Sequence, residues 1–310
     1  MKEPIISIII PCYNCSKTII STLASVQKNK TDQIEIVAVD DCSTDNTFSV
    51  LSELKFNISN LIVIKNNQNL GAGKTRNIAI SKSNGRYLLF LDSDDCLDSH
   101  CIDRLLEIIN NNENIDILFF DSYTKKGNKR NRFTPFFCKR MEQFDKHTLF
   151  VFSRGCVWGK LIKKEIVTKN NLKFEELPIA EDFIFLKKII YYSNHFYYLD
   201  RTLYFYNQNN PNSLMHRHHS SEENFELKAY SNLESSCSAV DFSNELNSIY
   251  FLEVVYGFNT RIFFSDLSFK HKRKLFKETI KKYNKNDCYF KKYARKYRFA
   301  YKLLRIFYFC

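Results

Sequence analysis

The sequence predicts an α/β fold with a mainly parallel sheet flanked by helices, followed by a helical, basic C-terminal region. Through the first 120 residues, short runs of β-branched residues alternate with helix-length segments of mixed polarity. This alternation is typical of parallel strands joined by crossover helices, with ligands bound where the strands end. From Ser220 onward almost every stretch is compatible with a helix, with breaks near Phe242-Ser243 and from Asn284 to Asp287.

Periodicity and turn residues locate the individual elements of the first half. β-branched and apolar runs predict strands at Ile6–Ile10, Ile34–Val39, Leu61–Lys65, Tyr87–Leu91 and Asp116–Phe120. Amphipathic segments between them predict helices at Lys17–Lys28, Asp45–Leu54, Gly73–Lys82 and Ser99–Asn111. A binding site is therefore expected in the segments that follow the first four strands.

The order of elements changes in the middle of the chain. The stretch from Tyr123 to Arg140 is basic, polar and without a clear period, so we expect a mobile connection or an insertion there. A helix is predicted at Glu181–Tyr192. Aromatic-rich strands are predicted after it at Phe196–Leu199 and Leu203–Asn207.

Composition restricts the protein to a globular chain of one large or two modest domains. Of its 310 residues 44% are hydrophobic, which is enough for a core. No apolar stretch approaches the roughly 20 residues that span a bilayer. The start Met1-Lys2-Glu3-Pro4 lacks a secretory signal, so a cytoplasmic location is expected. The ten cysteines are scattered, and in a reducing compartment they serve as small apolar residues.

The most informative stretch is the acidic end of the fourth predicted strand, Asp92-Ser93-Asp94-Asp95. Carboxylates gathered at one sheet edge repel one another unless a cation offsets their charge. Asp-x-Asp supplies hard oxygen ligands and leaves coordination positions for phosphate oxygens, as Mg²⁺ and Mn²⁺ prefer. A loop that only caps the next helix is the alternative, because Ser and Asp are also good turn and N-cap residues.

A second pair of carboxylates, Asp40 and Asp41, follows the second predicted strand. If the two strands are near neighbours, this pair lies beside the Asp92–Asp95 segment. A carboxylate at such an edge can accept the imide N–H of uracil or bind a ribose hydroxyl. Helix capping is the alternative, and it is the favoured role for Asp45.

Two further motifs indicate other chemistries. Cys12 and Cys15 have the spacing of a redox pair and follow a strand, so a thiol oxidoreductase is an alternative function. A zinc site would need a second closely spaced pair, and the sequence has no other Cys-x-x-Cys. The segment Gly71–Arg76 lacks the spacing of an ATPase phosphate loop. Its glycines can still bring a helix N-terminus to a charged ligand, with Lys74 or Arg76 adding positive charge.

Four segments together resemble the family 2 glycosyltransferases, in order and at the expected separations over the first 120 residues. They are Ser7–Asn14, Val39–Asp45, Asn69–Gly71 with Thr75–Asn77, and Phe90–Asp95. The resemblance implies a GT-A fold, which is Rossmann-like, together with a nucleotide-sugar donor and inversion at the anomeric carbon. Where the family has Ser or Thr at positions 12 or 15, this chain has cysteine, which favours small apolar residues over redox thiols.

The resemblance also implies roles for individual residues. By position, Tyr13 stacks on the base and Asp41 binds its imide edge. Asp94 ligates an Mn²⁺ or Mg²⁺ ion that bridges the diphosphate, with support from Asp92. Arg76 either contacts the diphosphate or forms a salt bridge that orders the acidic loops. The nucleotide-sugar site implied in this way comprises Pro11, Tyr13, Asn14, Asp41, Arg76, Asp92 and Ser93.

Glu181-Asp182 begins an amphipathic helix and resembles the family's Glu-Asp motif, whose Asp is taken as the catalytic base. Asp182 is therefore expected to remove the acceptor proton, with Glu181 positioning the acceptor or the base. Complementing the helix macrodipole is the alternative role for this acidic pair. Upstream, Trp158–Leu161 resembles the family's Trp-x-Lys-Leu segment, and Trp158 is either a sugar platform or a core residue.

The C-terminal region adds two expectations. One imidazole of His216–His219, preferably His216, would complete the metal shell, with a solvated loop as the alternative. From Lys270 to the end, 15 Lys and Arg stand against two acidic residues, so this tail accounts for the whole net charge of +12. Its regularly spaced tyrosines describe an amphipathic helix suited to an anionic membrane surface, or a packed helix with a solvated basic face. Nucleic-acid binding is not expected, because no reader motif accompanies these residues.

These observations predict an inverting glycosyltransferase that moves a sugar from a nucleotide-sugar donor, a UDP-sugar, to a hydroxyl of a surface-glycan acceptor. The acceptor would be lipooligosaccharide, capsule or O-antigen, free or lipid-linked. The expected catalytic domain is 1–215, with a nucleotide-sugar half at 1–120 and an acceptor half at 121–215, and 216–310 is the helical region. The enzyme is expected to be peripheral at the inner face of the cell membrane. A thiol oxidoreductase and a non-catalytic membrane- or nucleic-acid-binding module are the alternatives.

Overall fold

The computed structural model describes residues 3–29, 31–126, 129–136, 144–177, 180–208, 225–237, 239–250 and 268–280. The chain forms two compact units. Unit 1 comprises residues 1–139, 154–176 and 181–210, and unit 2 comprises residues 140–153, 177–180 and 211–310. The predicted boundary between 215 and 216 lies outside the described residues, so the division at that point stays a prediction.

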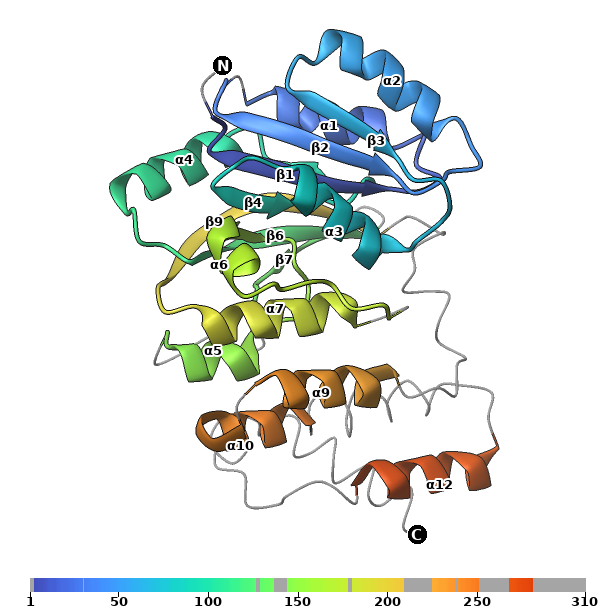
Figure 1. Ribbon diagram of the computed structural model, residues 1–310, viewed down its shortest axis with the longest axis vertical. Helices are drawn as coiled ribbons and strands as arrows, with labels where there is room; N and C mark the ends of the chain where they lie inside the picture. Colours follow the sequence, from blue (N-terminus) through green and yellow to red (C-terminus); the bar gives the residue numbers. More distant parts are fainter. Residues whose placement is uncertain are drawn as a thin grey trace. The chain divides into compact units, whose positions relative to one another are not determined.

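The first half of unit 1 is the predicted succession of parallel strands and helices (Figure 1). Strands β1 (Ile6–Cys12), β2 (Ile34–Asp40), β3 (Leu61–Lys65) and β4 (Tyr87–Phe90) are parallel, in the order β3-β2-β1-β4. Three helices connect these strands, and a fourth comes after the last of them. They are α1 (Ile19–Gln27), α2 (Thr47–Asn57), α3 (Ala72–Lys82) and, after β4, α4 (Cys101–Asn111). These four strands and four helices confirm the sequence-based elements to within three residues at either end.

The other half of the sheet mixes antiparallel and parallel pairs, so the mainly parallel prediction holds for β1 to β4 only. β8 (Lys160–Lys163) runs antiparallel to β4, and β6 (Ile117–Lys126) runs antiparallel to β8. β9 (Phe196–Asn207) runs parallel to β6, and β5 (Cys96–Leu97) closes the edge antiparallel to β9. Helix α6 (Lys164–Lys169) follows β8 directly, and α7 (Glu181–Tyr192) precedes β9.

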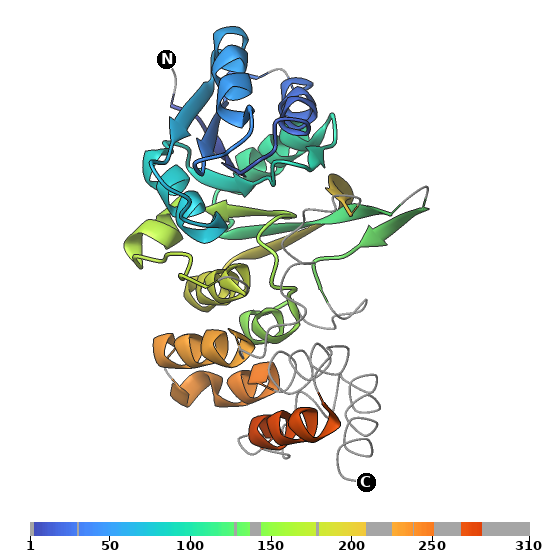
Figure 2. The same cartoon turned by 90° about the vertical axis from the view of Figure 1, so that its right-hand side faces the viewer.

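Two sequence-based expectations for unit 1 need correction. The stretch expected to be a mobile connection or an insertion contains the end of β6 and all of β7 (Lys129–Phe133), so a connection without regular structure is wrong there; Figure 2 shows this hairpin reaching away from the rest of the sheet. Arg130 and Arg132 are exposed there, so the hairpin lacks the apolar alternation of a half-buried strand. The two strands expected near the end of unit 1 are one strand, β9, whose register against β6 shifts beside Asp121.

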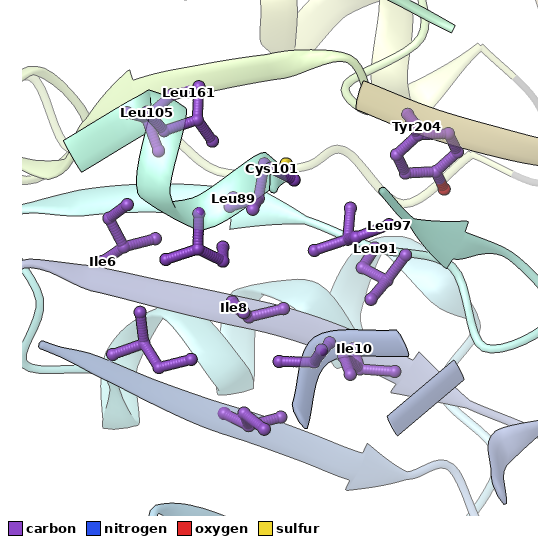
Figure 3. Close-up of a cluster of buried hydrophobic side chains, with 14 of the residues drawn as sticks. Ile6, Ile8, Ile10, Leu89, Leu91, Leu97, Cys101, Leu105, Leu161 and Tyr204 are labelled. Atoms are coloured by element: carbon purple, nitrogen blue, oxygen red, sulfur yellow. The ribbon is translucent and has the colours of Figure 1, made fainter. Parts of the chain in front are cut away.

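Helices cover both faces of the parallel half. On one face, Ile8 of β1, Leu89 of β4 and Leu105 of α4 belong to a buried apolar cluster (Figure 3) that also takes in α1 and α2. On the other face, α3 packs against β1 and β2, and Phe185 of α7 meets Phe90 of β4 edge to face, with 6.1 Å between ring centroids. Burial of each large apolar side chain contributes about 1.5–3 kcal/mol. Helices α3 and α7 therefore share one face, which brings their charged residues together.

Unit 2 is helical in its described parts. Its helices are α5 (Lys146–Phe152), α9 (Phe225–Ser236), α10 (Ala239–Ile249) and α12 (Phe269–Ile280). His147 stacks on Phe242 with 4.6 Å between ring centroids and hydrogen-bonds Glu245 at 3.0 Å, which joins α5 to α10. Phe242 has non-helical backbone angles, φ −118° and ψ 18°, which confirms the break predicted there.

Other predictions for the C-terminal region fall outside the described residues. They are the His216–His219 loop, the break from Asn284 to Asp287 and the aromatic tail beyond Ile280. Helix α12 is basic along its length, with a single acidic residue, Glu278. Across the described ranges, the structure contains no helix whose length and apolar content would let it cross a membrane.

Gly85, directly before β4, joins the amino ends of three strands. The buried Glu35 carboxylate of β2 accepts hydrogen bonds from Ser7 Oγ at 2.6 Å and from Gly85 N at 3.0 Å. Burial alone raises the pKa of Glu35, but these and neighbouring hydrogen bonds outweigh it and lower the pKa. The Gly85 backbone lies so close to β1 that a Cβ atom would stand 2.6 Å from Ser7 N.

Gly85→Ala is therefore expected to lower the free energy of unfolding by about 2 kcal/mol, because the added methyl group overpacks against backbone atoms. Urea unfolding followed by circular dichroism measures the change. Ser49→Ala, at an exposed position of α2, is the control and should alter the value by less than about 0.5 kcal/mol. Equal stability of the two variants would contradict the tight packing of this edge.

Candidate active site

The predicted site segments meet at one edge of unit 1, where β1, β2 and β4 end. Because the three strands are parallel neighbours, their carboxyl ends lie side by side. The loop after β1 is fastened to the loop after β2 by Asn14, whose Oδ1 accepts hydrogen bonds from Thr44 N at 2.8 Å and Asp45 N at 3.3 Å. Asn14 itself has a positive φ of 50°, which turns the chain sharply after the strand.

Two members of the predicted nucleotide site flank this turn. Tyr13 is 43% exposed, so its ring lies at the surface beside the strand ends. Pro11 is half-buried and still paired with Val39 of β2. The exposed ring is therefore free of the core, and Pro11 sets the direction in which the chain leaves the sheet.

Asp41 is buried and orders the loop between β3 and α3. Its Oδ1 accepts hydrogen bonds from Asn66 Nδ2 and Leu70 N, both at 2.8 Å. Its Oδ2 accepts one from Gly71 N at 2.8 Å, at a glycine whose φ of +82° strains other residues. An ionised carboxylate has about four lone-pair sites, so one acceptor site on Oδ2 remains.

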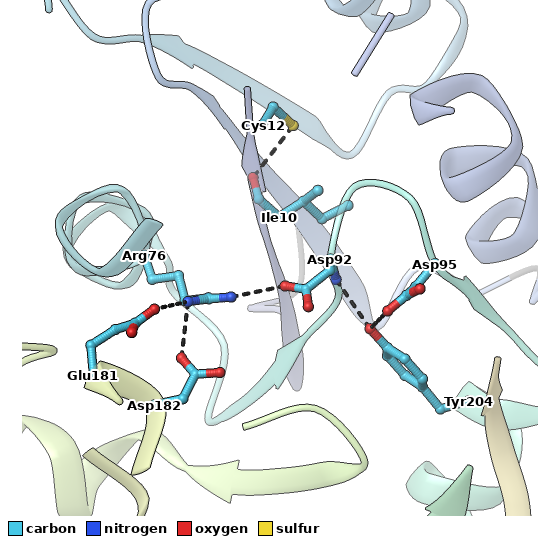
Figure 4. Close-up of polar contacts among 8 residues, drawn as sticks. All are labelled: Ile10, Cys12, Arg76, Asp92, Asp95, Glu181, Asp182 and Tyr204. Carbon is cyan, nitrogen blue, oxygen red and sulfur yellow. Dashed lines mark hydrogen bonds and ion pairs between the residues drawn. The ribbon is translucent and has the colours of Figure 1, made fainter. Parts of the chain in front are cut away.

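Arg76 of α3 is the centre of the acidic cluster (Figure 4). Its Nη1 lies 2.9 Å from Asp182 Oδ1 and 3.4 Å from Glu181 Oε1, and its Nη2 lies 2.9 Å from Asp92 Oδ1. Burial opposes its charge, but the three carboxylates outweigh that effect and raise the pKa of Arg76. The predicted salt bridge between Arg76 and the acidic residues is present, and contact of Arg76 with a diphosphate stays a prediction.

The glycine-rich start of α3 permits this contact. A Cβ atom at Gly73 would lie 3.2 Å from Glu181 Cγ and 3.2 Å from the carbonyl oxygen of Glu175. The glycine thus lets α3 approach the start of α7 closely. In this structure the segment that superficially suggested a phosphate loop serves helix packing.

Asp182 occupies the first turn of α7, where it accepts a hydrogen bond from Nη1 of Arg76. Burial raises its pKa, the charge of Arg76 lowers it, and the negative charges of Glu181 and Asp92 raise it again, giving about 7. A carboxylate with a pKa near 7 can accept a proton at neutral pH and still release it. The surroundings of Asp182 therefore give it the pKa that a general base needs at neutral pH.

Tyr204 of β9 stabilises the acidic loop after β4 through two hydrogen bonds. The Tyr204 hydroxyl donates to Asp95 Oδ2 at 2.6 Å and accepts a hydrogen bond from Asp92 N at 3.2 Å (Figure 4). Asn207 N donates to the other oxygen of Asp95 at 2.7 Å. Burial, with the charges of Asp92 and Asp94, raises the pKa of Asp95 well above its usual range. Asp95 thus anchors the loop, while Asp92, Ser93 and Asp94 are half-buried.

This loop fits a hard divalent cation. Burial is the main cause of the raised pKa of Asp95, and the negative charges of Asp92 and Asp94 add to it, so three carboxyl groups lie close together in this loop. Among the described residues no three metal-binding side chains come together. A site with one or two carboxylates, completed by phosphate oxygens and water, is how Mg²⁺ is usually bound. Asp94 and Asp92 are the residues that would hold such an ion, and His216 lies outside the described part of the chain.

Trp158, Cys12 and Cys15, which the sequence analysis also singled out, are buried in the protein. Trp158 is 9% exposed and stacks on Tyr204 with 5.2 Å between ring centroids, so it is the core residue of its two alternatives. The Cys12 thiol is buried, and its Sγ lies 3.6 Å from Ile10 O. Hydrogen bonding with Cys15, and burial, raise the pKa of Cys12 well above its usual range, whereas the same contact lowers the pKa of Cys15. The thiolate that a redox nucleophile needs is disfavoured at Cys12.

Sequence reasoning missed Tyr204 and Asn66, which support the predicted residues without being acidic or glycine-rich. Tyr204 was placed in a strand, but nothing in its neighbours indicated that its hydroxyl would reach the loop after β4. Asn66 follows β3 directly, so its position at the sheet edge was a usable signal.

Comparison with known proteins gives a family and a fold. The family model described as glycosyl transferase family 2 matches residues 7–163, about half of the chain. An uncharacterized glycosyltransferase of Haemophilus influenzae is 29% identical over 185 residues, covering 60% of this chain and 62% of the relative. The Escherichia coli UDP-Glc:alpha-D-GlcNAc-diphosphoundecaprenol beta-1,3-glucosyltransferase WfaP is 45% identical over 91 residues, covering 29% of this chain and 36% of the relative. The chain thus spans less than two thirds of the length of these relatives.

The fold also matches a solved structure. The crystal structure of S. aureus TarS residues 1–349 in complex with UDP-GlcNAc superposes with a TM-score of 0.63 at 23% identity. The match covers 89% of this chain and 71% of that chain. It confirms the expected GT-A fold.

Arg76→Met is expected to destabilise the protein by about 3 kcal/mol at pH 8, because it leaves three half-buried carboxylates without their cation. The loss should be smaller at about pH 5.5: without Arg76 the pKa of Asp182 rises further, so mild acid neutralises that carboxyl group. Urea unfolding at both pH values measures the difference. Arg104→Met removes an exposed ion pair with Glu107 and should cost less than about 1 kcal/mol at either pH. A pH-independent loss in Arg76→Met would contradict the ionic role.

Proposed function

Since the chain belongs to glycosyl transferase family 2, we propose that it transfers a sugar from a nucleotide-sugar donor to a hydroxyl group of a surface-glycan acceptor, with inversion at the anomeric carbon. One observation carries the proposal. Asp182, with a pKa raised to about 7, is held by Arg76 beside the acidic loop at the carboxyl edge of the sheet. A base and a cation-binding loop at one edge are the two parts that sugar transfer from a diphosphate requires.

The donor is a UDP-sugar in this proposal. The exposed ring of Tyr13 can stack on the base, and the remaining acceptor site of Asp41 can take the imide N–H of uracil. Pro11, Asn14 and Ser93 complete the walls of the nucleotide site. WfaP is named for UDP-Glc, and the TarS crystals contained UDP-GlcNAc, which supports a uridine nucleotide.

In this proposal Asp94 and Asp92 would hold a divalent ion, Mn²⁺ or Mg²⁺, and His216 would be a further ligand. When bound, the ion offsets the negative charge of the diphosphate leaving group. Arg76 contributes from the protein side: it keeps the Asp92 carboxylate aligned through its 2.9 Å ion pair.

Asp182 acts as the general base. Its carboxylate takes the proton of the acceptor hydroxyl as that oxygen attacks the anomeric carbon from the face opposite the diphosphate. The bond from carbon to the leaving oxygen breaks as the new one forms, so the configuration inverts without a covalent enzyme intermediate. Glu181 sits one residue away on the same helix and positions the acceptor or the base.

The acceptor is a glycan of the bacterial surface, such as lipooligosaccharide, capsule or O-antigen, free or lipid-linked. WfaP is named for a diphosphoundecaprenol-linked acceptor, which supports this class. The basic composition from α12 to the end of the chain suits an anionic membrane surface, at about 1 kcal/mol per Lys or Arg near the headgroups. The enzyme would then work at the inner face of the cell membrane, on an acceptor presented there.

Asp182→Asn is expected to lower kcat by about 10² to 10⁴-fold while nucleotide binding stays within about twofold of wild type, because the variant removes only the base. In the wild type, turnover should rise as the pH increases through about 7, where Asp182 loses its proton. Glu181→Gln removes a charge that raises the pKa of Asp182, so its acid limb should move to lower pH. An active Asp182→Asn variant, or an unmoved acid limb in Glu181→Gln, would rule out Asp182 as the base.

Release of nucleoside diphosphate from a panel of nucleotide sugars tests the donor and the metal together. We expect release from one UDP-sugar with Mn²⁺ or Mg²⁺ and none with EDTA. Asp94→Asn should lower this release by about 10²-fold or more, because one carboxylate charge at the cation is lost. Asp103→Asn, at an exposed position of α4, is the control and should behave as wild type. Metal-independent release, or wild-type release by Asp94→Asn, would contradict the metal site.

A further inference from the structure

Lys160, the first residue of β8, is a fully buried lysine close to the site. Its side chain is 0% exposed, and its Nζ donates to the carbonyl oxygens of Cys156 at 2.7 Å and of Trp158 at 3.2 Å. The Cys156 Sγ lies 3.7 Å from the same nitrogen. The ammonium group thus closes the turn formed by residues 155–160, which we name the β8 turn.

The β8 turn fits against the start of α7 at two points. The backbone N–H of Val157 faces the Asp182 carboxylate and favours its charged form. At Gly155, a Cβ atom would lie 2.9 Å from Phe183 Cβ and 3.1 Å from Phe183 Cα, so the backbones of the turn and the helix are in direct contact. Displacement of the turn would therefore move the donor that Asp182 uses.

Burying a lysine is costly, so its presence requires compensation. Burial lowers the pKa of Lys160, while Cys156 and the negative charge of Asp182 act in the opposite direction. An apolar residue of similar length would fill the same space without a desolvation cost, but it could not hold two carbonyl groups. Those two carbonyls belong to the residues on either side of Val157.

We propose that Lys160 is a positioning residue for Asp182: by holding the carbonyls of Cys156 and Trp158, it sets the Val157 N–H that orients the base. The inference rests on the proposed function, because it assigns to Asp182 the role of base. It predicts that loss of Lys160 lowers turnover and leaves nucleotide binding intact, since the nucleotide site is built from β1, β2 and β4.

The charged groups that face Asp182 come from four elements. Arg76 reaches it from α3, Asp92 acts from the loop after β4, Glu181 is its neighbour on α7, and Lys160 acts from β8. Arg154 lies close enough to Lys160 to lower the pKa of that lysine. Removing the Lys160 charge and loosening the Val157 N–H both favour protonated Asp182, so both move its pKa upward.

Lys160→Met is the primary test, with Lys164→Met as the matched control. Lys164 also donates to a backbone carbonyl, that of Ser83, but at the opposite edge of the sheet from the predicted site. In Lys160→Met we expect kcat to fall about tenfold, the acid limb of kcat to move to higher pH, and the dissociation constant of UDP to stay within about twofold of wild type. Lys164→Met should change none of the three. Thermal unfolding of both variants checks that they are folded at the assay temperature.

Lys160→Gln keeps N–H donors without the charge, so it tests the hydrogen-bonding role and serves if the Met variant does not fold. We expect it to retain more than about a third of wild-type kcat. The proposal is overturned if folded Lys160→Met has wild-type kcat and an unmoved acid limb, if UDP binding weakens as much as kcat, or if folded Lys160→Gln loses as much turnover as Asp182→Asn. An active Asp182→Asn variant instead overturns the base assignment itself, so the two failures are distinguishable.

Discussion

The ion pairs of Arg76 are the interaction on which the site depends. The guanidinium is 5% exposed and contacts carboxylates from two distant parts of the chain, the loop after β4 and the start of α7. A buried charge is tolerable only with its partners in place. The cluster can therefore form only when α3, β4 and α7 are assembled on one face of the sheet, and the fold and the site are completed in the same step.

The same cluster decides the chemistry of Asp182, because its charges do not balance. One guanidinium faces three carboxylates, Asp92, Glu181 and Asp182. The surplus negative charge, added to burial, outweighs the single cation and leaves the pKa of Asp182 at about 7. With one carboxylate fewer, the pKa of Asp182 would be lower, because Glu181 and Asp92 both raise it. The excess negative charge also lies beside the loop where a divalent cation and a diphosphate would bind. The same carboxylates would thus raise the pKa of the proposed base and attract the proposed cation.

Local sequence patterns were sufficient to predict the strands and helices that bury regular runs of apolar residues. Leu61–Lys65 and Glu181–Tyr192 have the predicted bounds, because period and capping decide such segments locally. The β6–β7 hairpin was missed because its exposed residues carry no apolar alternation. The candidate site was predicted as a set of strand ends, since parallel strands bring their carboxyl ends to one edge. The supports of that site, Tyr204 and Lys160, could not be foreseen, since their contacts join residues that the strand order brings together.

Asp182 shows why tertiary context, and not the helix start alone, decides a carboxyl group's function. An acidic residue in the first turn of a helix is stabilised in its charged form by the macrodipole, which alone would lower its pKa. In this protein burial and neighbouring carboxylates reverse that effect. The turn before β8 contributes to this burial, because Gly155 packs directly against Phe183 at the start of α7. The Val157 N–H of the same turn acts in the opposite direction and favours the charged form of Asp182. The turn that leads into β8, an antiparallel strand that the parallel prediction did not include, thus packs against the start of the helix that carries Asp182.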